Sequence, residues 1–304
     1  MERLIELPVP RSRYDLELTM YPSFILVMFV RDDCWLVKRY GYAKGVKIRQ
    51  MLDRVHVVLP HGVSVDVSRE LTGLWYEPER LIEDVDARYR DVVEVLVNSC
   101  SAIRIAISSR DPVHIFVSTF LSRNTDYYTN VIRWVQTLCE LTGDDLSYLD
   151  LDTVRKVSSS YQLTELPEAL RQFLSGPLRL YLDGASHWDI RRELLKIRNV
   201  GPKVADAFLI FTGKTTELAP SDIHFRRFVS KLRLFESYVL PEKRYCVKYR
   251  CDECPRTRCL TGLAYRTFGR LSSWIQTVSY VIDRVYCSRI KCIECPLYRK
   301  ICNV

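Results

Sequence analysis

The sequence predicts a mainly α-helical protein with a small β-rich (α+β) domain at its N-terminus and a cysteine-rich region at its C-terminus. Residues 14–66 are rich in β-forming residues, whereas apolar residues between 86 and 211 recur mainly at spacings of three and four. Eight of the 11 cysteines fall in the last sixty residues. We therefore expect a β-rich domain over 1–80, a helical core over 81–240, and a cysteine-rich region over 241–304 that completes the helical core.

Composition and charge fit a globular protein that binds a polyanion. The chain has 304 residues, 47% of them apolar and 27% charged, which is enough to build a real core. Its formal charge is +8, and the excess lies after His187, where 23 Lys or Arg face 11 Asp or Glu. A polyanionic partner is therefore expected to meet the C-terminal part of the chain.

The sequence gives no signal for a membrane. Its first residues, MERLIELPVP, lack the apolar segment of a secretory signal. The longest apolar run, residues 24–30, is too short to cross a bilayer. We therefore expect a cytoplasmic protein without a membrane partner.

Four stretches of the N-terminal region have strand character. YDLELTMY (14–21) alternates, FILVMFV (24–30) is a short apolar run, and CWLVKRY (34–40) is rich in β-formers. VHVVLPHGVSVDV (55–67) resembles a hairpin with Pro-His-Gly at its turn. These stretches predict the strands of the β-rich domain.

Helical spacing begins after Val67. It predicts helices over residues 86–100, 112–121, 128–141, 167–174, 187–197 and 202–211. Ser186-x-x-Asp189 predicts a capping box at the start of the helix over 187–197. One more helix, LSSWIQTVSYVIDRVY (271–286), is predicted within the cysteine-rich region.

The turn Arg198-Asn199-Val200-Gly201 joins two of these helices. Pro202 suits the first position of the second helix, because the N–H that proline lacks would be unpaired there. Asn199 and Gly201 are the turn residues best able to adopt positive φ. Such a turn exposes backbone N–H groups at a helix N-terminus, which hold a phosphate without reading bases. The alternative is a helix–helix turn with no ligand.

Two charged residues follow this turn. Lys203 lies at the start of the second helix, and Asp222 lies nineteen positions later, directly before a basic helix. Taken alone, Lys203 is an exposed lysine and Asp222 is the N-cap of that helix.

Three blocks of sequence together resemble the helix-hairpin-helix Gly/Pro-Asp superfamily of base-excision DNA glycosylases, which includes endonuclease III and 8-oxoguanine glycosylase. LLKIRNVGPKVADAFLIF followed by LAPSDIHFRRF is similar to the hairpin and aspartate motif. FLSRNTDYYTNVIRWVQTL is similar to the helix that borders the lesion pocket, and DPVHIFVSTF to the segment before it. The blocks have the family's order and spacing from about residue 110 to the C-terminus. The resemblance implies a two-lobed helical fold.

The resemblance also implies a bifunctional DNA glycosylase and AP lyase that acts in base-excision repair. Members with lysine at the position of Lys203 use it as the nucleophile that forms a Schiff base with the sugar, and Asp222 matches the catalytic aspartate. We expect a lowered pKa for Lys203, because the amine must be neutral to attack. Arg198-Asn199 replaces the commoner Pro-Gly and Ser221 replaces valine, and neither change is expected to abolish function.

The implied partner is double-stranded DNA that contains a damaged base or an abasic site. The target base must leave the duplex, so a side chain must fill the gap. The resemblance implies this role for Arg123 and Asn124, and phosphate binding for Asn199, Val200 and Gly201. A surface arginine is the alternative for Arg123. We expect a monomer, associated with the nucleoid in a prokaryote.

The cysteines form two groups of four. Compact C-x-x-C groups in an intracellular protein indicate metal or iron–sulfur ligation. The last group resembles the [4Fe–4S] loop of endonuclease III with altered spacing, and consists of Cys287, Cys292, Cys295 and Cys302. The earlier group is predicted to bind a second [4Fe–4S] cluster or Zn²⁺, and consists of Cys246, Cys251, Cys254 and Cys259. Unligated cysteines or disulfides are the alternative.

The base that is removed stays open. The N-terminal region resembles 8-oxoguanine and alkyladenine glycosylases, whereas the cluster loop resembles endonuclease III. Ala207 stands where 8-oxoguanine enzymes often carry cysteine. We expect an oxidised purine, with an oxidised pyrimidine or a mismatched uracil or thymine as alternatives. A non-catalytic DNA-damage-binding iron–sulfur protein and an electron-transfer iron–sulfur protein are the alternatives from other classes, and the pairing of Lys203 with Asp222 argues against the first of these.

Overall fold

The computed structural model describes residues 2–9 and 14–301, and most of them are helical. The helices, in chain order, are α1 (Leu16–Met20), α2 (Val65–Thr72), α3 (Arg90–Cys100), α4 (Pro112–Leu121), α5 (Ile132–Thr142), α6 (Leu151–Val157), α7 (Tyr161–Ser175), α8 (Pro177–Leu182), α9 (His187–Lys196), α10 (Pro202–Phe211), α11 (Ile223–Lys231), α12 (Lys243–Cys246), α13 (Leu260–Phe268) and α14 (Ser272–Val281).

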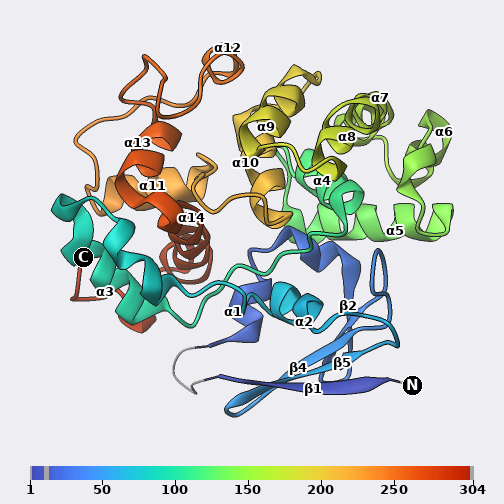
Figure 1. The fold of residues 1–304 in the computed structure, drawn as a ribbon, viewed down its shortest axis with the longest axis horizontal. Coiled ribbons are helices and arrows are strands. Elements are labelled where there is room, and N and C mark those ends of the chain that lie inside the picture. Colours follow the sequence, from blue (N-terminus) through green and yellow to red (C-terminus); the bar gives the residue numbers. More distant parts are fainter. Residues whose placement is uncertain (1, 10–13, 302–304) are drawn as a thin grey trace.

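The helices form two groups above a small sheet (Figure 1). One group contains α4 to α8, and the other contains α3, α11, α13 and α14. Helices α9 and α10 pack against each other, and α10 also packs on α4. In chain order, α3 therefore belongs to the second group, the next helices form the first group, and the chain then passes back to the second group, which α11, α13 and α14 complete. This confirms the mainly α-helical fold with a β-rich N-terminal part.

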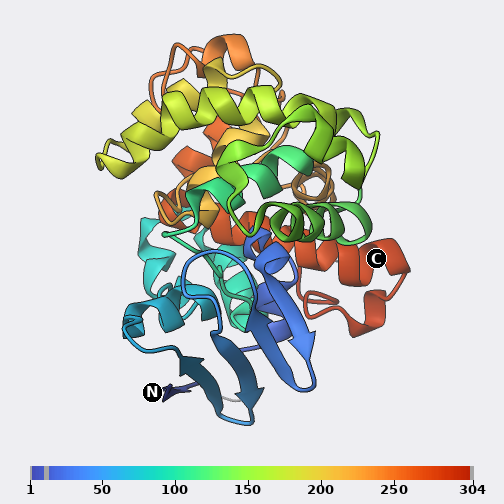
Figure 2. The same cartoon turned by 90° about the vertical axis from the view of Figure 1, so that its right-hand side faces the viewer.

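The sheet is antiparallel, and its strands are β1 (Arg3–Pro8), β2 (Phe29–Asp32), β3 (Trp35–Lys38), β4 (Lys47–Met51) and β5 (Arg54–Leu59). Their order is β1-β5-β4-β3-β2. Val55, Val57 and Leu59 in β5 are fully buried and alternate with more exposed residues, as the period of a strand requires. This face packs beneath the helices, and Figure 2 shows the sheet below them.

Two of the predicted N-terminal strands are partly or wholly helical. Residues 14–21 contain helix α1 instead of a strand, because Asp15 caps Leu18 N–H at 2.9 Å. The spacing of the buried residues fits a helix as well as a strand, since Leu16, Thr19 and Met20 form the buried side of α1. Residues 24–30 start as a 3₁₀ helix, and only Phe29 onwards joins β2.

The predicted hairpin over 55–67 is also wrong. Strand β5 ends at Leu59 and pairs with β1 and β4, and the chain then turns into α2. Ser64 accepts a hydrogen bond from Asp66 N–H and so caps α2, which explains why VSVDV does not form a return strand. Strands β1 and β4 lie outside the stretches that were predicted as strands.

The helix predictions are mostly right, with shifted boundaries. The helices over 112–121 and 202–211 agree with α4 and α10, and Ser186 caps α9 as predicted by accepting a hydrogen bond from Asp189 N–H. Helix α7 starts six residues earlier than predicted, with Pro167 inside it. A 3₁₀ turn precedes α3, and π-helical turns precede α5 and follow α14. Helices α2, α6, α8, α12 and α13 were not predicted.

Helix α14 is the centre of the second helix group. Its side chains Trp274, Ile275, Val278 and Val281 are fully buried. The indole of Trp274 donates a 2.8 Å hydrogen bond to Ile103 O, which joins α14 to the segment before α4. One continuous hydrophobic core runs from the sheet to this helix.

A buried ion pair fixes the sheet to the helices. Lys38 Nζ lies 2.8 Å from Asp111 Oδ2, and both side chains are almost completely inaccessible. The ammonium group also donates to Tyr40 O and Tyr42 O.

None of the helices within residues 2–9 and 14–301 combines the length and apolar character needed to cross a bilayer.

Candidate active site

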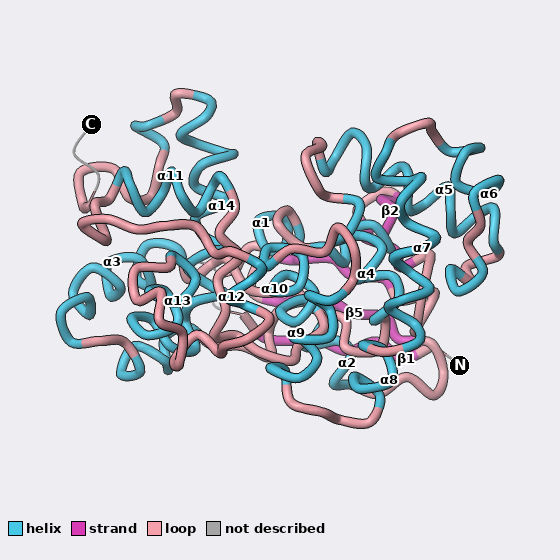
Figure 3. Tube along the Cα trace, turned by 90° about the horizontal axis from the view of Figure 1, so that it is seen from above, coloured by secondary structure: helices cyan, strands magenta, loops and turns pink. Residues whose placement is uncertain are grey.

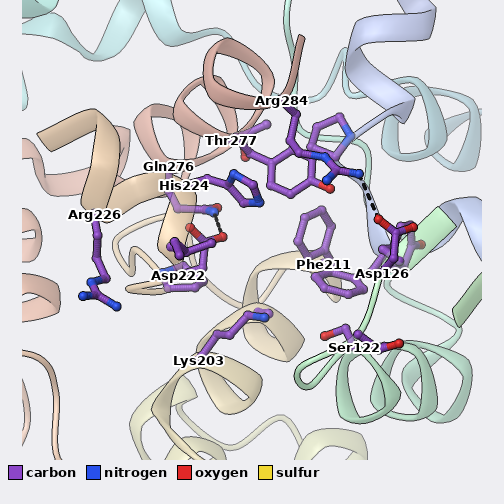
Figure 4. A pocket seen from close by; sticks show the side chains of 18 of the residues that line it. Ser122, Asp126, Lys203, Phe211, Asp222, His224, Arg226, Gln276, Thr277 and Arg284 are labelled. Atoms are coloured by element: carbon purple, nitrogen blue, oxygen red, sulfur yellow. Dashed lines mark hydrogen bonds and ion pairs between the residues drawn. The ribbon is translucent and has the colours of Figure 1, made fainter. Parts of the chain in front are cut away.

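A cavity of about 450 Å³ lies where the two helix groups meet (Figure 4). Five separate segments of the chain form its wall: Pro22 and Phe24; Ser122 and residues 124–127; Lys203, Ala207 and Phe211; Pro220, residues 222–224 and Arg226; and Gln276, Thr277, Tyr280 and Arg284. The cavity thus brings together residues from the N-terminal region, the hairpin and the last helix.

Lys203 reaches this cavity from the second residue of α10. Gly201 is the N-cap of the helix and Pro202 occupies its first position, as predicted. Burial lowers the pKa of Lys203 from its usual value, while the negative charge of Asp222 acts in the opposite direction. A larger share of the amine is therefore neutral near pH 7 than for an exposed lysine.

Asp222 faces Lys203 across the cavity (Figure 4). Each of its carboxylate oxygens accepts a hydrogen bond. Oδ1 accepts from Phe225 N–H at 2.8 Å, so Asp222 is the N-cap of α11 as predicted. Oδ2 accepts from the amide of Gln276 at 2.9 Å. Burial raises the pKa of Asp222, and the bond from Phe225 N–H and the charge of Lys203 oppose this. The two residues thus face each other in one cavity.

Aromatic rings line much of the remaining wall. Phe24 packs edge-on against Tyr127 and Phe211, with ring centroids 5.2 and 5.1 Å apart. His224 packs edge-on against Tyr280 at 4.6 Å. These rings offer flat apolar surfaces of the kind on which a planar base stacks.

Polar groups gather at the end of the cavity away from Lys203 (Figure 4). Arg284 donates to Asp126 Oδ2 at 3.1 Å, and Asp126 Oδ1 accepts from Tyr128 N–H and Thr129 N–H. His224 Nδ1 lies 2.6 Å from Asp283 Oδ2. This end of the cavity therefore presents a guanidinium group and a carboxylate close together.

The hairpin turn has one residue with positive φ, and it is not the glycine. Of the two turn residues best able to adopt positive φ, Asn199 does so with φ +64°, whereas Gly201 has φ −102°. Gly201 acts as the N-cap instead, a position that needs extended backbone. A Cβ added to Gly201 would meet no atom within 4 Å, so the fold itself does not require glycine there. Val200 is buried beneath the turn.

Arg123 is held against the hairpin. Its guanidinium donates to Asn199 O at 3.2 Å, to Phe120 O, and to Glu165 Oε2 at 2.8 Å. Asn124, next to it, is exposed and has φ +50°. Its amide donates only a long 3.3 Å bond, to the hydroxyl of Tyr161.

An open groove of about 440 Å³ runs along the hairpin beside the cavity. Lys203 and Asn124 line both the groove and the cavity. Gly201 and Pro202 form the floor of the groove near the start of α10. The structure therefore brings together the predicted residues Lys203, Asn124, Asn199 and Gly201 along one groove, with Asp222 in the adjoining cavity.

The cysteines of the last group follow α14. Cys287 and Cys295 line a small cavity of about 40 Å³ beneath the loop, and Lys231 Nζ lies 3.5 Å from Cys287 Sγ. Cys292 begins a 3₁₀ turn, and Cys302 lies outside the described residues. A lysine N–H directed at a sulfur suits a thiolate ligand set, so the donors fit an iron–sulfur cluster.

The earlier group lies on the loop between α12 and α13. Cys251 and Cys259 are buried, whereas Cys246 and Cys254 are half-buried. None of the cysteines within the described residues forms a disulfide. Elsewhere among the described residues, the side-chain ligand atoms of His114, Cys139 and Asp144 lie within 4.8 Å of one another. His114 Nε2 is 2.9 Å from Asp144 Oδ1.

Gln276, Tyr280 and Arg284 line the cavity but were not identified from the sequence. They lie four residues apart, on one face of α14 and the turn that follows it. This regular polar spacing on an otherwise apolar helix was a signal that could have identified them.

Comparisons with solved structures support the same architecture. MBOgg1, solved in complex with a low-affinity DNA ligand, aligns with a TM-score of 0.68 and 18% identity, over 93% of this chain and 96% of that one. The Clostridium acetobutylicum 8-oxoguanine glycosylase/lyase in its apo form gives 0.64 and 16%, over 92% and 97%. The 3-methyladenine DNA glycosylase of Archaeoglobus fulgidus gives 0.64 and 14%, over 92% and 98%.

The chain therefore has the fold of the helix-hairpin-helix DNA glycosylases, as the resemblance implied. No protein-family model matches it. A curated relative, a probable N-glycosylase/DNA lyase of Methanothermobacter thermautotrophicus, is 26% identical over 132 residues. The matched region is 43% of this chain and 36% of the length of that relative.

Proposed function

We propose that this protein is a bifunctional DNA glycosylase and AP lyase of base-excision repair. The observation that carries the proposal is that Lys203 and Asp222 share one cavity beside the hairpin groove. The names of the curated relative and of a structural neighbour, an N-glycosylase/DNA lyase and an 8-oxoguanine glycosylase/lyase, agree with it.

In the proposed reaction, Lys203 is the nucleophile. Its neutral amine forms a bond to C1′ of the flipped nucleotide, and the glycosidic bond breaks with its electron pair leaving on the base, which takes up a proton. The sugar ring then opens to a protonated imine. Loss of a proton from C2′ breaks the bond between C3′ and the phosphate oxygen, and this β-elimination nicks the strand. The lowered pKa of Lys203 supports this role.

Asp222 stabilises the positive charge that develops at C1′ as the base departs. A carboxylate performs the same electrostatic task in sugar hydrolysis. Its two hydrogen bonds, from Phe225 N–H and Gln276, fix its orientation towards the cavity. The N-terminus of α11 helps to keep it ionised.

The hairpin holds a phosphate next to the flipped nucleotide. Backbone N–H groups at the N-terminus of α10 offer an anion site, and the missing side chain of Gly201 leaves room for a close approach. We assign this contact to Asn199, Val200 and Gly201.

Asn124 is our choice for the residue that fills the gap in the duplex. It is exposed and lies at the junction of the groove and the cavity. Arg123, bonded to Glu165 and to the hairpin, instead holds the segment that carries Asn124.

The base is proposed to carry a carbonyl oxygen, as oxidised purines do. Arg284 at the end of the cavity supplies N–H donors, and a guanidinium group commonly pairs with the carbonyl oxygen of a base. Oxidised pyrimidine, uracil and thymine also carry a carbonyl oxygen. Excision assays on a panel of duplexes, each with one of these bases, are therefore needed to distinguish them.

A [4Fe–4S] cluster on Cys287, Cys292, Cys295 and Cys302 completes the proposal. Its role would be structural, because it would hold the loop after α14 in place.

The protein is proposed to act as a monomer on double-stranded DNA, since its own residues supply the whole cavity wall. The division into residues 1–80, 81–240 and 241–304 is part of this proposal.

Borohydride trapping on DNA with an abasic site tests the lysine directly. The wild-type protein is expected to form a covalent adduct, and Lys203→Gln is expected to form none. Lys196→Gln is the matched control, because Lys196 is an exposed lysine at the end of α9 and should not affect trapping. An adduct with Lys203→Gln, or none with wild type, would overturn the lyase assignment and favour a non-catalytic damage-binding protein.

A further inference from the structure

We propose that Cys246, Cys251, Cys254 and Cys259 bind a second tetrathiolate metal centre, and that this centre holds the DNA-binding hairpin in place. The ligand is Zn²⁺ or an iron–sulfur cluster, since both take four cysteine thiolates. We call residues 246–259 the cysteine loop.

The ends of the cysteine loop are fixed by backbone bonds. Cys246 is the last residue of α12, and Cys259 is the N-cap of α13. Val239 N–H donates to Arg258 O, and Leu260 N–H donates to Val239 O, both at 2.9 Å. These bonds hold the end of the loop at Val239, and the carboxylate of Glu242, the N-cap of α12, pairs with Arg256 near that end. Contacts therefore join the start and the end of the cysteine loop.

The interior of the loop has little regular structure of its own. Residues 247–258 contain only turns and bends. Arg266 donates to Cys251 O at 2.9 Å, which turns this part of the loop towards α13. A short segment of this kind, rich in charges and poor in apolar residues, gains stability from a bound metal.

A buried cation lies against the thiols. Arg191 of α9 is fully buried and lines a small cavity together with Cys246, Trp188 and Arg250. Four thiolates around Zn²⁺ or a [4Fe–4S]²⁺ core leave about two negative charges to be neutralised. Arg191, although paired with Asp206, and Arg250 both place guanidinium groups beside Cys246, where an anionic centre needs positive charge.

Both helix α12, which precedes the cysteine loop, and the loop itself contact the hairpin. Helix α12 packs on α9, the first helix of the hairpin, and Figures 1 and 3 both place them near each other. Lys243 Nζ donates at 2.9 Å to Ile197 O, where α9 ends and the turn begins. Arg250 lies over the ring of Trp188 in α9 at 5.4 Å. A metal that orders the loop therefore also restrains the turn that holds Asn199 and Gly201.

Metal analysis of the full chain, purified without oxygen, tests the first part. The test variant is Cys254→Ser, because Cys254 is half-buried and serine there leaves the core unchanged. It is expected to lose either one zinc ion, or about four iron and four sulfide per chain, relative to wild type. The exposed Cys34→Ser is the matched control and is expected to keep the full content. Equal metal content in Cys254→Ser and wild type would overturn the site, and the element that is lost identifies the ligand.

Hydrogen exchange tests the second part. In Cys254→Ser, amides of the hairpin turn 197–201 are expected to exchange faster than in Cys34→Ser, and duplex DNA is expected to bind more weakly. Unchanged exchange at 197–201 despite metal loss would overturn the link to the hairpin. Neither readout depends on Lys203, so borohydride trapping judges the glycosylase proposal separately.

Discussion

Arg191 and Asp206 form a buried ion pair that joins the two helices of the hairpin. Arg191 Nε lies 2.6 Å from Asp206 Oδ1, and both side chains are almost completely inaccessible. Burial raises the pKa of Asp206, and the guanidinium of Arg191 opposes this shift. Asp206 lies three residues after Lys203 on α10, so the pair links the stability of the hairpin to the position of the proposed nucleophile.

Asp206→Asn is expected to destabilise the protein by about 3–5 kcal/mol, because it leaves the charge of Arg191 buried and unpaired. Urea denaturation measures this change. Glu193→Gln on α9, the helix that carries Arg191, is the control, because Glu193 and Lys196 form a partly exposed pair worth at most about 1 kcal/mol. Similar losses for both variants would contradict the prediction.

Gly201→Ala is expected to leave the stability within about 0.5 kcal/mol of wild type, because its φ of −102° and the open space around it accept a methyl group. If a phosphate approaches this backbone, the same change weakens binding to duplex DNA. Thermal denaturation and fluorescence anisotropy measure the two effects.

Asn199 is the matched comparison for Gly201. Asn199→Gly should retain both stability and binding, since φ of +64° suits glycine. Asn199→Ala should cost about 1 kcal/mol. DNA binding by Gly201→Ala at the wild-type level would count against the phosphate site.

Gln276→Ala is expected to slow base excision by about 10- to 100-fold, because a hydrogen bond to a charged group contributes about 1.5–3 kcal/mol. Its amide holds Asp222 Oδ2 in the ionised form, so its removal should raise the pKa of Asp222 and shift the acid limb of the pH–rate profile to higher pH. Single-turnover excision across pH measures both effects. Gln136→Ala, remote from the cavity, is the control, and a lower rate without the pH shift would show a merely structural role.

The pH dependence of trapping reports on Lys203. Only the neutral amine attacks, and burial lowers the pKa of Lys203 below its usual 10.5. Trapping on abasic DNA should therefore increase with pH and reach half of its maximum below that value. Asp222 raises the pKa of Lys203, so Asp222→Asn should move the midpoint to lower pH. Asparagine retains the helix cap, and a midpoint that moves upwards would refute the coupling.

Much of the fold could be predicted because strong local signals agree with the final packing. The cap at Ser186, the proline at the start of α10 and the cap at Asp222 are all decided within a few residues. The N-terminal region was harder, because Leu16, Thr19 and Met20 fit a helix as well as a strand. Local caps at Asp15 and Ser64 decided the outcome there.

The cavity itself could be predicted only in part. Lys203 and Asp222 belong to recognisable motifs, whereas Gln276 and Arg284 acquire their positions from the packing of α14. The ion pair of Arg123 also depends on packing, since its partner Glu165 lies 42 residues further along the chain. Such partners are set by the tertiary fold and leave no local trace.

The cavity is assembled from the earliest and the latest parts of the chain. Pro22 and Phe24 meet Gln276 and Arg284 across it, although more than 250 residues separate them. During synthesis, the hairpin and its groove can take shape well before the residues that close the last wall emerge from the ribosome. The cavity that holds Lys203 and Asp222 is thus complete only after α14 has been synthesised and has packed against the other helices. A partly synthesised chain without α14 lacks one wall of the proposed active site.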